Sequence, residues 1–123
     1  MKKILMSILL ALGLVGCSSG GDYNHISQSE AKEMMDNTKD YAIVDVRTKE
    51  EYKEGHIKNA INIPNETISD NVSDVLKDKS QVILVYCRSG NRSKQASSKL
   101  AKLGYTNIYE FGGINTWEYG LIK

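Results

Sequence analysis

The chain has 123 residues, enough for one domain of moderate size and too few for two. Its 16 lysines and arginines nearly balance its 15 aspartates and glutamates, so no strong basic field points to a nucleic acid partner. The only histidines are His25 and His56, and there is no Cys-x-x-Cys pair, so the sequence contains no metal-binding pattern.

The first residues have the layout of a secretory signal peptide. Lys2 and Lys3 form a basic start, and a mostly apolar run extends from Ile4 to Val15. The run is shorter than the roughly 20 residues that a permanent membrane-spanning helix needs. We therefore expect residues 1–16 to be removed, which leaves 14 basic and 15 acidic residues and a formal charge of −1.

The end of this segment, Leu14-Val15-Gly16-Cys17, resembles the lipobox of bacterial lipoproteins. The resemblance implies that Cys17 becomes the first residue of the mature protein and carries a thioether-linked lipid. Residues 17–22 would then be a flexible tether and residues 23–123 the folded domain. We expect the domain outside the cytoplasm, held on a bacterial membrane surface by its lipid. An ordinary secretory signal with a chance cysteine is the alternative.

Strand-like and helix-like runs alternate along the rest of the chain. Ser27–Glu30 and Thr48–Glu51 are capping boxes, which predict two helix starts. Apolar runs predict strands at 41–46, 60–63, 81–86 and 107–110. Periodicity predicts helices at 93–103, in a short segment around Trp117, and in a stretch with four apolar residues at helical spacing, namely Ile68, Val72, Val75 and Leu76. This order predicts an α/β fold with a mostly parallel sheet.

Cys87 directly follows the strongest predicted strand, at the edge where parallel sheets bind ligands. After it, Gly90 permits a tight turn into a helix, so that several backbone amides can converge on a hollow that attracts small anions. Such a hollow also lowers the pKa of a thiol, and Arg88 and Arg92 would strengthen the field if their side chains turned inward. The residues predict a nucleophilic thiolate beside an anion site. A buried structural cysteine is the alternative.

Three motifs resemble those of one family, the rhodanese-domain sulfurtransferases. Tyr86-Cys87-Arg88-Ser89-Gly90-Asn91-Arg92-Ser93 is similar to its active-site loop, residues 44–64 to its upstream signature, and Gly112-Gly113 with Trp117 and Gly120 to its C-terminal signature. The resemblance implies a central five-stranded, mostly parallel sheet with helices on both faces. It also implies that Cys87 takes sulfur from a small anion such as thiosulfate, carries it as a persulfide, and passes it to cyanide, a thiol or a protein.

The resemblance also assigns roles to the surrounding residues, and it implies no metal or organic cofactor. The donor anion would be held by Arg88, Ser89, Gly90, Asn91, Arg92 and Ser93. Asp45 and Arg47 would support the loop, and we expect them to form a structural ion pair. We expect His56 to tie down a turn, Trp117 to pack in the core or the pocket wall, His25 to be exposed, and residues 49–54 to be an ordinary solvated helix face.

Three other functions stay open. A persulfide carrier or redox-sensing module would use Cys87 with little turnover. A phosphatase or arsenate reductase is disfavoured, because such loops read Cys-x5-Arg, whereas here Arg92 gives Cys-x4-Arg and position 93 is Ser. A structural protein with an inactive site is disfavoured because Cys87 is present. The sequence does not indicate an oligomeric state.

Overall fold

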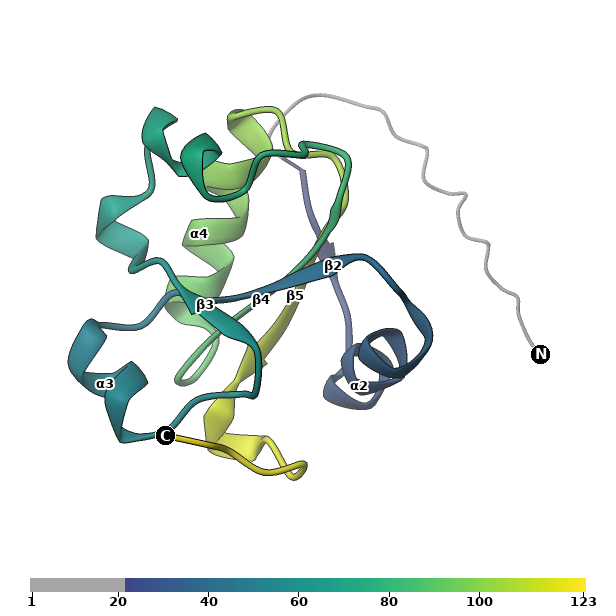
Figure 1. Ribbon diagram of the computed structural model, residues 1–123, viewed down its shortest axis with the longest axis vertical. Helices are drawn as coiled ribbons and strands as arrows, with labels where there is room; N and C mark the ends of the chain where they lie inside the picture. The colour runs from purple at the N-terminus through teal and green to yellow at the C-terminus, as the bar shows by residue number, and fades with distance from the viewer. Residues whose placement is uncertain (1–21) are drawn as a thin grey trace.

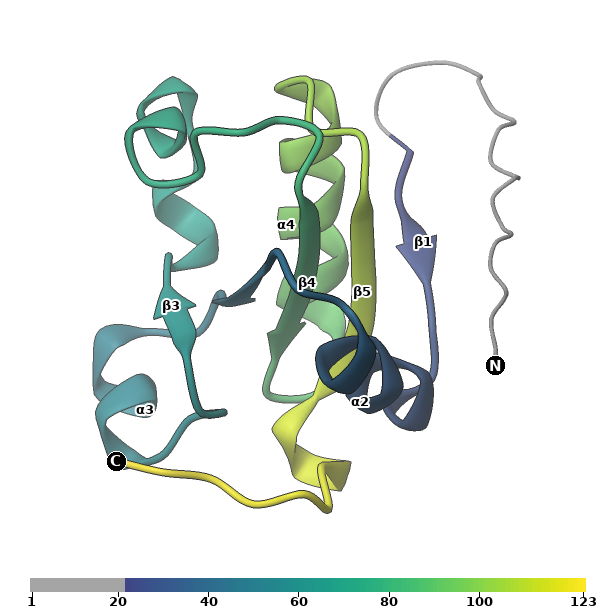
Figure 2. The ribbon, with the colours of Figure 1, turned by 45° about the vertical axis from the view of Figure 1, so that its right-hand side comes forward.

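In the computed structural model, which describes residues 22–123, parallel strands form one five-stranded sheet in the order β1-β5-β4-β2-β3 (Figures 1 and 2). The strands are β1 Asn24–His25, β2 Tyr41–Asp45, β3 Ala60–Asn62, β4 Val82–Cys87 and β5 Ile108–Gly113. The helices are α2 Gln28–Asn37, α3 Lys49–Glu54 and α4 Asn91–Lys102, with 3-10 turns η1 Asn65–Thr67, η2 Asp70–Asp74 and η3 Ile114–Thr116. The predicted signal peptide, Cys17 and all but the last residue of the predicted tether lie outside the described residues.

The strands β2 and β4 form the centre of the sheet and are apolar on both faces, as their unbroken hydrophobic sequences predict. Successive side chains of a strand point to opposite faces. Ile83 and Val85 therefore join the core on one side of the sheet, and Leu84 and Tyr86 join the core on the other. This confirms the predicted α/β fold with helices on both faces.

Each face of the sheet has its own cover. The helix α4 packs on one face with Ala96, Leu100 and Ala101, together with Val72 and Leu76 from the η2 region. On the other face α2 buries Ala31, and the half-buried Met34 and Met35 pack beside it. Figure 2 shows α4 behind β4 and β5, with α2 in front.

Both predicted capping boxes are present. Ser27 Oγ accepts the Glu30 N–H at 3.1 Å, and the Ser27 N–H donates to Glu30 Oε1 at 2.8 Å. The reciprocal bonds of Thr48 and Glu51 measure 3.2 and 3.0 Å. Each box satisfies amides that have no partner inside the helix, which fixes where α2 and α3 begin. Gly55 ends α3.

Several predicted boundaries differ from the structure, most of them by one residue. The helix α4 begins at Asn91, two residues before the predicted start, because Gly90 adopts a left-handed φ of +111° and turns the chain at once. The strand β5 continues through Gly113 instead of stopping at Glu110.

No helix within residues 22–123 is long and apolar enough to cross a membrane.

A larger difference lies in the segment predicted as a helix from Ile68 to Leu76, which forms only a 3-10 turn at Asp70–Asp74. Val75 is 54% exposed and lies outside the core. Polar side chains in this segment bond locally, as Ser73 Oγ does to the Asp70 carbonyl at 3.1 Å. Such bonds compete with regular helix formation, which explains the shorter turns.

Candidate active site

Cys87 is the last residue of β4 and is 1% exposed. Its Sγ accepts a hydrogen bond from the Gly90 N–H at 3.0 Å and lies 3.5 Å from Ser93 Oγ. The sulfur therefore faces the backbone turn that joins β4 to α4. This is the position at the carboxyl edge of the sheet that the sequence predicts.

The turn creates an environment that favours a thiolate. Burial raises the pKa of the Cys87 thiol, but hydrogen bonds from the Ser93 hydroxyl and from the amides of Ser93, Gly90 and Ser89 outweigh it, so the pKa is lowered overall. The 12-residue helix α4 begins at this turn, so the positive end of its dipole lies beside the sulfur. The predicted anion-holding character of the loop thus has a geometric basis.

The Gly112-Gly113 pair allows β5 to pass close to this loop. A Cβ atom at Gly113 would lie 1.9 Å from the Arg88 carbonyl oxygen, closer than any real contact. The register between β4 and β5 shifts between Val85 and Cys87, which pairs Cys87 with Gly113. The Asn115 N–H then bonds the Arg88 carbonyl at 3.1 Å. These backbone contacts fix the start of the loop without side chains.

The two loop arginines differ in their surroundings. Arg88 is exposed and lines a surface cleft together with Glu51, Glu54 and Asn115. Arg92 forms a bidentate pair with Glu51, with Nη1–Oε1 at 2.7 Å and Nη2–Oε2 at 3.1 Å. Both terminal nitrogens of Arg92 are therefore engaged by Glu51, so the side chain is not directed freely at Cys87 as the sequence analysis considered.

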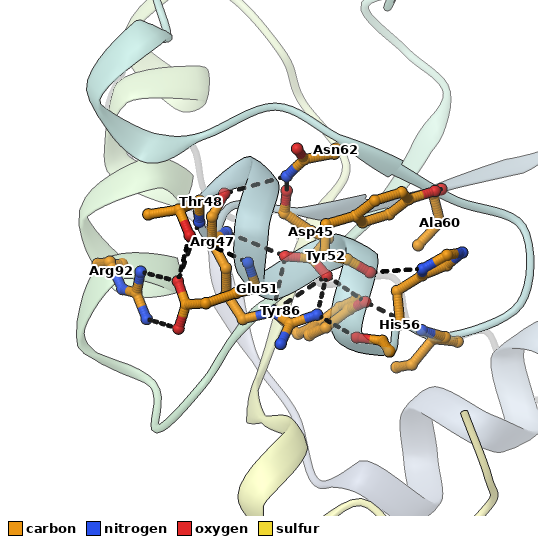
Figure 3. A network of polar contacts seen from close by, with 12 residues as sticks. Asp45, Arg47, Thr48, Glu51, Tyr52, His56, Ala60, Asn62, Tyr86 and Arg92 are labelled. Atoms are coloured by element: carbon orange, nitrogen blue, oxygen red, sulfur yellow. Dashed lines mark hydrogen bonds and ion pairs between the residues drawn. The ribbon is translucent and has the colours of Figure 1, made fainter. Parts of the chain in front are cut away.

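The pair with Arg92 corrects the view of residues 49–54 as a purely solvated helix face. The Arg92 guanidinium and the Thr48 amide lower the pKa of Glu51 to about 2, against the opposing effect of burial. In turn Glu51, and at longer range Cys87, raises the pKa of Arg92. Because Glu51 also caps α3, this one carboxylate joins the start of α3 to the first turn of α4 (Figure 3).

Asp45 and Arg47 form the predicted ion pair, and both are buried. Asp45 Oδ2 accepts from Arg47 Nη2 at 2.6 Å and from the Tyr86 hydroxyl at 2.6 Å. Arg47 Nη2 also donates to the Gly55 carbonyl at 2.6 Å, and the Ile57 N–H donates to Tyr86 Oη at 3.1 Å. The pair is thus linked to Tyr86, the residue that precedes Cys87.

Two of the remaining aromatic residues lie where the sequence analysis expected. His56 is buried, stacks on Tyr52 with ring centroids 3.7 Å apart, and bonds the Tyr52 carbonyl through Nδ1 at 2.9 Å. It therefore ties down a turn. Trp117 is half-buried and packs on Phe111, with ring centroids 5.4 Å apart. Neither side chain contacts Cys87 among the described contacts.

Sequence reasoning missed Glu110, which is 0% exposed. Its Oε2 accepts from Ser93 Oγ at 2.5 Å and from the Gly112 N–H at 2.8 Å, and its Oε1 lies 2.6 Å from His25 Nδ1. His25 is 63% exposed, as expected, but it is also a partner of this buried carboxylate. Glu110 lies two positions after Ile108 in a predicted strand, so both side chains point to the same face of the sheet. This pattern could have identified Glu110 as a buried acidic residue.

Fold and loop together define a class of protein, namely parallel α/β domains that hold a cysteine against backbone amides at the carboxyl edge of the sheet. Residues 27–119 match the model of the rhodanese-like domain, and the chain belongs to that family.

Within residues 22–123 no group of three or more His, Cys, Asp and Glu side chains could hold a metal ion.

Similar proteins agree with this assignment. The chain is 37% identical over 71 residues to the thiosulfate sulfurtransferase PspE of Escherichia coli, covering 58% of this chain and 68% of that protein. It is 35% identical over 95 residues to a sulfurtransferase of Allochromatium vinosum, covering 76% of this chain and 87% of the relative. A solved structure described as rhodanese with anions from E. coli superposes with a TM-score of 0.63 at 32% identity, covering 68% of this chain and 98% of that one.

Proposed function

We propose that this protein is a sulfurtransferase that moves sulfane sulfur from thiosulfate, or a related anion, to a thiol, a protein or cyanide through a persulfide on Cys87. The names of its relatives support sulfurtransferase activity in general. The observation that carries the proposal is the position of Cys87 Sγ, 3.0 Å from the Gly90 amide at a helix start, with its pKa lowered.

The proposed reaction has two displacement steps. In the first, the Cys87 thiolate attacks the outer sulfur of thiosulfate, a new S–S bond forms, and the S–S bond of the donor breaks. Sulfite leaves with that electron pair, and Cys87 holds the persulfide. In the second, an acceptor such as cyanide attacks the terminal sulfur, thiocyanate forms, and the Cys87 thiolate returns.

The loop supports this chemistry by stabilising negative charge. Both the thiolate and the persulfide are anions, and the amides of Ser89, Gly90 and Ser93 lie where they can hold such charge. The six-residue loop from Cys87 to Arg92 is one residue shorter than a Cys-x5-Arg loop, which favours sulfur over a phosphate with its larger oxygens. The E. coli structure described as containing anions agrees with an anion site in this family.

The arginines have different proposed roles in donor binding. Arg88 is exposed on the loop and can meet a dianion such as thiosulfate as it approaches. Arg92 contributes positive charge near Cys87, but its guanidinium must leave or share Glu51 to bind the donor directly. We therefore assign first contact with the donor to Arg88.

The test is turnover of thiosulfate and cyanide by the full chain, followed as thiocyanate. Steady turnover that is lost in Cys87→Ser and kept in the matched control Cys17→Ala supports the proposal. A stoichiometric persulfide without turnover would instead identify a persulfide carrier. Equal activity with and without Cys87 would refute both functions.

We also propose that the protein acts outside the cytoplasm, attached to a bacterial membrane by lipid on Cys17. The support is the sequence of residues 1–17, with its basic start, short apolar run and lipobox-like end. Cells fed a labelled fatty acid should label the wild-type protein and not Cys17→Ala. Label that persists in the variant would refute the anchor.

A further inference from the structure

Ser93 lies between Glu110 and Cys87, and each of them can accept a hydrogen bond from its single hydroxyl. Its Oγ lies 2.5 Å from Glu110 Oε2 and 3.5 Å from Cys87 Sγ. The carbonyl oxygens of Gly90 at 2.9 Å and Gly112 at 3.4 Å are also within reach. A charged carboxylate at 2.5 Å is a stronger acceptor than a neutral carbonyl or a more distant sulfur. Glu110 therefore holds the Ser93 proton in this structure.

The surroundings of Glu110 explain why its charge matters. It lies on β5, between β1 and β4, and the three strands run side by side (Figure 2). The titratable groups that face it are His25 from β1 and, through Ser93 of α4, Cys87 from β4. The Gly112 N–H from its own strand completes the set. Because the carboxylate is fully buried, these neighbours are the groups that compensate its charge.

We propose that Glu110 is a positioning residue that sets the ionisation of Cys87 through Ser93. With Glu110 charged, the carboxylate draws the Ser93 O–H towards itself and weakens the hydrogen bond that Ser93 gives to the Cys87 sulfur. The loop still favours the thiolate, but less strongly than it would with the full Ser93 hydrogen bond. Glu110 and Cys87 therefore compete for one hydroxyl.

His25 is the solvent-exposed neighbour of Glu110. Its exposed ring carries Nδ1 2.6 Å from Glu110 Oε1. A protonated His25 neutralises the carboxylate, weakens its hold on Ser93, and leaves the hydroxyl available to Cys87. The inference relies on the proposed function only in taking the Cys87 thiolate as the nucleophile.

The test measures the thiolate directly, without sulfur transfer. In the full chain carrying Cys17→Ala, Cys87 is the only thiol, and its ultraviolet thiolate absorbance and its rate of alkylation by iodoacetamide are followed against pH. Glu110→Gln keeps the shape of the side chain and removes its charge. We expect the midpoint of thiolate formation to fall by about one pH unit, or about tenfold more thiolate below the midpoint. An unchanged or higher midpoint would overturn the proposal.

A double-mutant cycle tests whether the effect passes through Ser93. In the Ser93→Ala background, Glu110→Gln should shift the midpoint less than half as far. An equal shift would mean that Glu110 acts through space alone, and would overturn the proposed role. Ser93→Ala by itself should raise the midpoint by clearly less than one unit, because Glu110 already takes the larger share of the hydroxyl's hydrogen bond. A rise of a full unit in that variant would contradict the inference even if Glu110→Gln failed to fold.

The two proposals fail in different ways. If thiocyanate turnover is absent and the midpoint still falls in Glu110→Gln, sulfur transfer is refuted and the control of Cys87 stands. If turnover depends on Cys87 and the midpoint does not move, the reverse holds.

Discussion

The ion pair between Glu51 and Arg92 leads to a prediction about stability. Glu51→Gln removes the negative charge, but the glutamine can still serve the capping box at the start of α3, which accepts either residue. The substitution therefore tests the contact between α3 and α4 and leaves the helix start largely intact. We expect Glu51→Gln to lower stability at neutral pH.

The magnitude follows from the pKa of Glu51, which is lowered from 4.5 to about 2 in the folded protein. Each pKa unit corresponds to about 1.4 kcal/mol, so the full shift sets an upper limit of about 3.4 kcal/mol. The two side chains are 21% and 28% exposed, and solvent screening reduces the contribution. We expect a loss of about 1–2 kcal/mol at pH 7, with each kcal/mol lowering the melting temperature by roughly 4–8 °C.

The loss must depend on pH in one direction. Because the folded pKa lies below the unfolded one, the folded state binds fewer protons, and the stabilisation is present above about pH 4.5 and lost as the pH falls towards 2. Urea unfolding of wild type and Glu51→Gln at pH 7, 4 and 3 should give curves that converge. Glu50→Gln, an exposed neighbour on α3, is the matched control and should change little. A difference that stays constant from pH 7 to 3 would refute the role of the ion pair.

Two further substitutions test how the site is built. Gly113→Ala would place a Cβ 1.9 Å from the Arg88 carbonyl and should lower the free energy of unfolding in urea by about 3 kcal/mol or more. In the control Gly120→Ala the new Cβ meets no atom within 4 Å, so only backbone strain of about 1–2 kcal/mol is expected. Equal losses in the two variants would contradict the close approach of β5 to the loop. Tyr86→Phe leaves the Ile57 N–H without its acceptor and should lower the free energy of unfolding by about 1–3 kcal/mol. Hydrogen exchange at the Ile57 amide should become faster. Unchanged exchange at this amide would contradict the network around Asp45.

Features fixed by neighbouring residues could be predicted from the sequence. The capping boxes of Ser27 and Thr48 depend on side chains three residues apart, and both have the predicted geometry. The position of Cys87 at the end of a buried strand followed from the apolar run before it and from Gly90 after it. The ion pair of Asp45 and Arg47 also joins residues two positions apart.

Features that depend on the register of distant segments could not be predicted. Glu51 and Arg92 are 41 residues apart, and nothing in either segment indicates the other. Glu110 is bonded to Ser93 and His25 only because β1, β5 and α4 meet at one place. The pattern of one strand shows that Glu110 shares a face of the sheet with Ile108, but it does not show which polar groups of other segments lie on that face. These long-range pairings are the part of the site that the fold supplies.

The shared direction of the strands fixes where the described chain begins relative to the reactive sulfur. The edge strand β1 is the first element of the described chain and runs parallel to β5, so Asn24 lies level with Tyr109, whereas Cys87 lies level with Gly113 at the opposite end of that strand (Figure 2). Four residues of strand separate these levels by about 13 Å. If the chain is attached through Cys17, the polypeptide enters the sheet before the level of the reactive sulfur and β1 then runs towards it. The attachment point and the loop would then lie towards opposite ends of the sheet.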